Sequence, residues 1–86
     1  MKTFKDLEFE PHPLGNGLQA TMNFDNNYGV SVIKFTGSYG YRQNLWEVAI
    51  LYKEELTYDT DIADNVLGSQ TKQDVTDVMK KVQALI

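Results

Sequence analysis

Apolar side chains occupy every second position from residue 18 to residue 24, and this alternation constrains the fold more than any other feature of the chain. The apolar positions are Leu18, Ala20, Met22 and Phe24, and the positions between them are Gln19, Thr21 and Asn23. Successive side chains of a β-strand point to opposite faces of the sheet. The segment therefore predicts a strand of an antiparallel sheet that is covered on one face only. Asp25-Asn26-Asn27 predicts a hairpin turn, with a β-bulge at Gly29.

The segment from Tyr28 to Phe35 breaks this simple alternation. Tyr28, Val30 and Val32 share one parity, whereas Ile33 and Phe35 share the other. Two explanations stay open: a bulge shifts the phase, or both faces of this strand are covered. Dense apolar content favours a central strand.

The segment 45–52 has the same character. One predicted face carries Trp46, Val48, Ile50 and Tyr52, and the other is partly apolar. A polar turn over 53–55 then predicts a hairpin with a last strand at 56–60. At the N-terminus, residues 7–10 alternate before Pro11, which predicts a short edge strand because proline cannot donate to a ladder.

The C-terminal segment has a helical period instead. Apolar residues recur three, four, seven, ten and eleven positions after Val75, and they are Val78, Met79, Val82, Leu85 and Ile86. This stripe predicts an amphipathic helix, with Thr71 and Asp74 forming a capping box at its start. For 59–69 two alternatives stay open: a short helix capped by Asp61 and closed by Gly68, or an irregular loop.

Together these segments predict one α+β domain over residues 1–86. It is an antiparallel β-sheet of about four to five strands, meander-like, with the C-terminal amphipathic helix packed on one face. The 86-residue chain has no cysteine and one histidine, His12 between two prolines. We therefore predict no catalytic residues, no metal site and no cofactor. No apolar run approaches the roughly 20 residues of a membrane span, and the first ten residues carry no signal peptide. We expect no membrane association and a cytoplasmic location.

The net charge of −4 is unevenly distributed. Residues 1–53 carry five acidic and five basic side chains, whereas residues 54–86 carry seven acidic and three basic ones. No basic cluster is present, so nucleic-acid binding is disfavoured. The predicted acidic surface consists of Glu54, Glu55, Asp59, Asp61 and Asp64. It is either a solvated face or a contact for a basic partner. The aspartate spacing departs from an EF-hand loop, because Ile62 and Ala63 stand where ligands or the turn glycine are needed.

The connection from Gly37 to Asn44 is longer than a hairpin requires. Its residues Tyr39, Tyr41 and Arg42 are of the types enriched at interface hot spots. We predict that these three residues form a binding surface and that Trp46, just beyond them, packs in the core. Glycine and serine neighbours predict an adaptable loop.

Three stretches resemble a group of small uncharacterised proteins from tailed-phage and prophage genomes. They are FKDLEFEPHP (4–13), QATMNFDNNYGVSV (19–32), and ELTYDTDIADNVLG (55–68) with the TKQDV helix start (71–75). The resemblance implies a phage or prophage origin and action inside the bacterial host cell. The stretches carry no catalytic motif, so the resemblance transfers no functional residue.

The leading hypothesis is a non-catalytic accessory protein that binds another protein. The contact would use the Tyr39–Arg42 loop, the acidic segment 54–64, or an exposed sheet edge that pairs with a second copy in a homodimer. An alternative is a small-ligand protein in which Tyr39, Tyr41 and Trp46 stack on a nucleotide base while Arg42 binds its phosphate. A third hypothesis is an enzyme that uses His12 with the carboxylates of 59–64.

Overall fold

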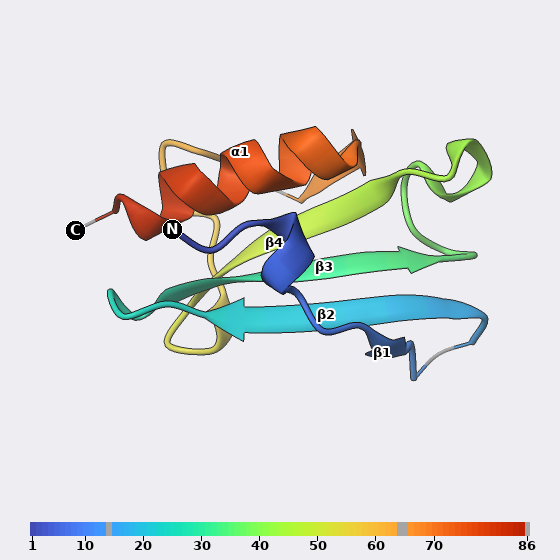
Figure 1. Cartoon of the computed structure of the whole chain (residues 1–86), viewed down its shortest axis with the longest axis horizontal. Coiled ribbons are helices and arrows are strands. Elements are labelled where there is room, and N and C mark those ends of the chain that lie inside the picture. The colour runs from blue at the N-terminus through green and yellow to red at the C-terminus, as the bar shows by residue number, and fades with distance from the viewer. Residues whose placement is uncertain (14, 64–65, 86) are drawn as a thin grey trace.

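A computed structural model, which describes residues 1–13, 15–63 and 66–85, shows an antiparallel sheet with a helix packed on one face (Figure 1). The predicted α+β class is confirmed. The strands are β1 (Glu10–Pro11), β2 (Gly17–Asn23), β3 (Tyr28–Phe35), β4 (Trp46–Tyr52), β5 (Glu55–Leu56) and β6 (Leu67–Gln70). The helix is α1 (Lys72–Gln83), and two short 3-10 helices are η1 (Phe4–Asp6) and η2 (Tyr41–Gln43).

Strands β1 to β5 lie side by side in chain order, which confirms the predicted meander. The sheet differs from the prediction in its sixth strand, because β6 also pairs with β4. Strand β5 pairs at the end of β4 through Leu51 and Tyr52, and β6 pairs at its start through Trp46 and Val48. Strand β3 pairs along one edge of β4. Strands β5 and β6 therefore share the opposite edge of β4.

The face of the sheet beneath α1 holds the core. Cross-strand neighbours along two rows are Ala20, Val32 and Val48, and then Met22, Val30 and Ile50. The helix side chains Val75, Val78, Met79 and Val82 are buried against this face, which confirms the predicted stripe. Ile86 lies outside the described residues.

Trp46 is 6% exposed, as predicted for a core residue. The rings of Phe4 and Phe9 pack against it, with ring centroids 5.2 Å and 4.6 Å from the tryptophan ring. The N-terminal segment thus covers the part of the core that α1 does not reach.

Helix α1 starts at the predicted capping box. The Asp74 N–H donates to Thr71 Oγ1 at 3.1 Å, and the Thr71 N–H donates to Asp74 Oδ2 at 3.0 Å. The bond from the Thr71 N–H to the carboxylate is the main cause that lowers the pKa of Asp74 below its ordinary value of 3.8.

The predictions for the N-terminal edge strand and for a bulge at Gly29 are wrong. The edge strand is Glu10–Pro11 and not 7–10, because Phe4 and Phe9 both pack on Trp46 and Leu7 is buried in the core. No bulge occurs at Gly29, where β2 and β3 pair in unbroken register from Gly17 to Asn23. Gly29 instead allows close pairing, since a Cβ there would lie 2.5 Å from the Met22 carbonyl oxygen.

The segment from 55 to 70 also departs from the prediction. The last hairpin strand is only Glu55–Leu56, not 56–60. In the described part of 59–69, Asp61 caps no helix, and Gly68 belongs to β6. Neither alternative for this segment anticipated a strand.

Substitutions at two glycines with nearly equal φ angles can test how closely β2 and β3 approach each other. Gly15 and Gly17 have φ of 150° and 153°. A Cβ at Gly15 would meet nothing within 4 Å, whereas one at Gly17 would lie 2.2 Å from the Lys34 carbonyl oxygen. We expect Gly17→Ala to lower the free energy of unfolding by about 1–3 kcal/mol more than Gly15→Ala. Equal losses in urea denaturation would contradict this.

The capping box predicts a dependence of stability on pH. When folding lowers the pKa of a carboxyl group, the group stabilises the fold at any pH above its pKa in the unfolded chain. This contribution disappears as the pH falls through its pKa in the folded state. Wild type should therefore exceed Asp74→Asn in thermal midpoint at neutral pH, and the gap should close below about pH 4. Asp77→Asn, an exposed position on the same helix, is the matched control. A gap that is unchanged at low pH would exclude this role for the carboxylate.

Candidate functional site

The connection between β3 and β4 (residues 37–44, the 37–44 loop) is held by a buried serine at its base. Ser38 is 8% exposed, and its hydroxyl donates to the Phe35 carbonyl at 2.8 Å while accepting from the Phe35 N–H at 3.0 Å. The Ser38 N–H also donates to the Phe35 carbonyl at 2.8 Å. The serine thus closes the turn out of β3, and the loop is not the adaptable segment that its composition predicts.

The rest of the 37–44 loop is fixed against β6. The Ser69 N–H donates to the Tyr39 carbonyl at 3.3 Å, and the Leu45 N–H donates to the Gly40 carbonyl at 2.9 Å. Gly40 has φ of 92°, and a Cβ there would lie 2.8 Å from Ser69 Cα. Only glycine fits this close approach without strain.

The three predicted binding residues all lie on this loop, with different exposure. Tyr39 is 69% exposed, Arg42 is exposed and Tyr41 is half-buried within η2. The Tyr39 N–H donates to Glu47 Oε1 at 3.2 Å. Tyr39 therefore combines an exposed side chain with a backbone held at both its N–H and its carbonyl. Such an amphipathic ring on a fixed backbone offers a large contact area at a low entropic cost.

The predicted acidic surface lies at the other end of β4. Glu54 lies in the β4–β5 turn, Glu55 begins β5, and Asp59 and Asp61 follow β5, all exposed. Asp64 lies outside the described residues. The seven residues of β4 separate this turn from the 37–44 loop, a span of about 23 Å. The structure therefore shows two separate surfaces.

His12 is far from these carboxylates and has a packing role. Its ring stacks on Phe35 with centroids 3.9 Å apart and an interplanar angle of 6°. The His12 backbone N–H donates to the Gly17 carbonyl, next to the start of β2, whereas Asp59 and Asp61 follow β5 at the opposite end of the sheet. The structure does not bring together the groups that the enzyme hypothesis needs. Within residues 1–13, 15–63 and 66–85, no three histidine, aspartate or glutamate side chains form a group that could hold a metal ion.

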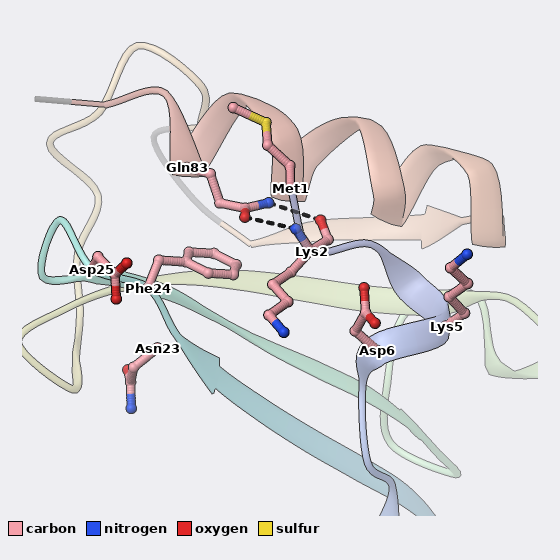
Figure 2. A pocket seen from close by; sticks show the side chains of 8 residues that line it. All are labelled: Met1, Lys2, Lys5, Asp6, Asn23, Phe24, Asp25 and Gln83. Atoms are coloured by element: carbon pink, nitrogen blue, oxygen red, sulfur yellow. Dashed lines mark hydrogen bonds between the residues drawn. The ribbon is translucent and has the colours of Figure 1, made fainter.

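Sequence reasoning missed a surface hollow of about 490 Å³ between the N-terminal segment, the end of β2 and the end of α1 (Figure 2). The Lys2 N–H and carbonyl are both hydrogen-bonded to the Gln83 side chain at 2.8 Å, which ties the N-terminus to the helix. Lys2, Lys5, Asp6 and Asp25 line the hollow, together with the Phe24 ring. No local sequence signal marks it, because its walls come from three distant parts of the chain.

The charges around this hollow are mixed, and one of them is already engaged. Asp6 Oδ2 accepts from the Thr3 N–H at 2.8 Å, and this bond is the main cause that lowers the pKa of Asp6. The carboxylate therefore has a structural role in holding η1. The two lysines and two aspartates that line the hollow give it mixed charge, with no cluster of one sign that would select a ligand.

A scan against protein-family models and searches of curated proteins and solved structures found no match to this chain. No helix among the described residues is long and apolar enough to cross a membrane.

The base of the 37–44 loop and its tip should respond differently to truncation. Ser38→Ala should cost about 1–3 kcal/mol of unfolding free energy, because it removes the buried hydroxyl that accepts from the Phe35 N–H and donates to the Phe35 carbonyl. Tyr39→Ala should change the unfolding free energy by less than about 0.5 kcal/mol. Urea denaturation measures both. A large loss for Tyr39→Ala would show that the tyrosine is a packing residue and not a free contact.

Proposed function

We propose that this chain is a non-catalytic accessory protein of phage or prophage type that acts in the bacterial cytoplasm by binding another protein. The contact surface is the tip of the 37–44 loop, where Tyr39 and Arg42 are exposed and Tyr41 is half-buried. The observation that carries the proposal is Tyr39, whose side chain is 69% exposed while its backbone is held by Glu47 and Ser69.

The arrangement suits a protein partner because little conformational entropy is lost when a pre-formed loop binds. Tyrosine and arginine supply both apolar area and hydrogen-bond donors. The acidic residues Glu54, Glu55, Asp59 and Asp61 lie too far away to share one small contact with the loop. They form a separate surface that would raise the association rate of a basic partner.

A pull-down from bacterial lysate tests this proposal. The Tyr39/Tyr41/Arg42 triple alanine variant should lose a partner that wild type retains, with a loss in affinity of roughly a hundredfold for two to three hot-spot residues. The matched control is the Tyr52/Tyr58/Lys80 triple alanine variant, which also removes two tyrosines and one cation from exposed positions away from the loop.

Equal recovery of every partner by wild type and the loop variant would refute the role of the loop. A thermal-shift series with nucleotides addresses the alternative of a small-ligand protein. A ligand that binds the folded state raises its melting temperature. A rise with wild type that the loop variant lacks would favour nucleotide binding over protein binding.

A further inference from the structure

The face of the sheet that points away from α1 is apolar on its two central strands. Because β3 and β4 pair in unbroken register, Ile33 and Ala49 lie on this open face, as do Phe35 and Leu51. The open face of β2 carries polar side chains instead, as solvated faces of antiparallel sheets usually do. The mixed phase of β3 is therefore not caused by a bulge. Its apolar residues Ile33 and Phe35 lie on the open face, outside the core.

Within the part of the chain that the structure describes, only the two ends of this open face are covered. His12 stacks on Phe35 at one end, and Leu51, 6% exposed, lies beside its cross-strand partner Leu56 at the other. Between these ends Ile33 and Ala49 remain half-buried, and Leu56 is 58% exposed. The centre of this face is therefore uncharged and partly apolar, which allows a second sheet to pack on it.

The open face also has a definite relief. One row across the strands holds the small residues Thr21, Ser31 and Ala49. The neighbouring row holds the larger Gln19, Ile33 and Glu47. A trough therefore runs across the strands beside a ridge whose centre is Ile33, and its middle bears no charge.

We propose that a second copy of this chain packs face to face on this surface and forms a two-fold symmetric dimer. Such a contact is isologous, so Ile33 of each copy packs over Ser31 and Ala49 of the other. Glu47, the acidic residue on the ridge, is already engaged by the Tyr39 N–H. The two inner faces would lie about 10 Å apart, as in a β-sandwich. This dimer does not depend on the loop function proposed above.

The size of the face sets the expected strength of the dimer. Only β2, β3 and β4 run for seven or eight residues, so strand spacing and rise give the open face a plan of roughly 14 by 23 Å, or about 330 Å² per copy. A dimer would bury roughly 700 Å² in total, which is the size of a weak and transient contact. We therefore expect a dissociation constant in the range of about 0.1–1 mM, and not a permanent dimer.

Pairing of strands at the free edge of β2 is the competing mode of self-association. The Phe24 N–H donates to the Tyr28 carbonyl, and the His12 N–H donates to the Gly17 carbonyl. Hydrogen-bonded pairs alternate along an antiparallel ladder. The backbone N–H and carbonyl groups of Thr21 and Asn23 therefore point away from β3, along the part of the β2 edge that β1 does not pair with.

Sedimentation velocity of the full chain from about 1 μM to about 1 mM separates the outcomes. Wild type should be monomeric at the lowest concentration and should form dimer toward the upper end of this range. Ser31→Arg, which places a charge in the trough, should stay monomeric throughout. Gln73→Arg adds the same charge on exposed α1 and should behave as wild type. Ile33→Ala, a milder change, should weaken the dimer by roughly a hundredfold because each copy loses the contact.

Circular dichroism melts of each variant verify that it is folded before the comparison. A wild type that stays monomeric at the highest concentration overturns the proposal, as does a Ser31→Arg variant that dimerises like wild type. Loss of the dimer in Asn23→Pro but not in Ser31→Arg would assign self-association to the β2 edge instead. Failure of the dimer leaves the lysate pull-down unaffected, so the two proposals fail separately.

Discussion

The packing of α1 on the valine-rich face of β3 and β4 is the contact on which the rest of the structure depends. Val30, Val32, Val48, Val75 and Val82 are fully buried there. Because side chains alternate along a strand, this contact also decides which residues are left outside. Ile33 and Ala49 lie half-buried on the open face for the same geometric reason that Val32 and Val48 are buried in the core. The core and the proposed dimer surface are thus two sides of one pair of strands.

The length of β4 also separates the two surfaces that the sequence analysis predicts, the 37–44 loop and the acidic surface. Its start carries the 37–44 loop, which β6 holds in place through Ser69, and its end carries the acidic turn with Glu54. Glu47 on the open face connects the loop to the sheet by accepting from the Tyr39 N–H. The loop is therefore part of the sheet's end and presents Tyr39 on a fixed backbone.

Features with a local physical cause could be predicted from the sequence. The alternation around Ala20, the stripe on α1 and the capping box at Thr71 all depend on residues near one another in the chain. Strand β6 could not be predicted, because Leu67-Gly68-Ser69-Gln70 has little intrinsic strand preference and is held by pairing with β4. The burial of Ser38 and the hollow beside Lys2 likewise arise from contacts between distant segments.

The most direct test of the account is a concentration series of amide NMR spectra, because it locates self-association residue by residue. The face-to-face dimer predicts shifts that grow with concentration at Ser31, Ile33 and Ala49, and none on the exposed side of α1 at Gln73 and Lys80. Spectra that do not change across the micromolar to millimolar range would contradict it. Changes confined to Thr21 and Asn23 backbone amides would contradict it as well, since they would place the contact at the sheet edge.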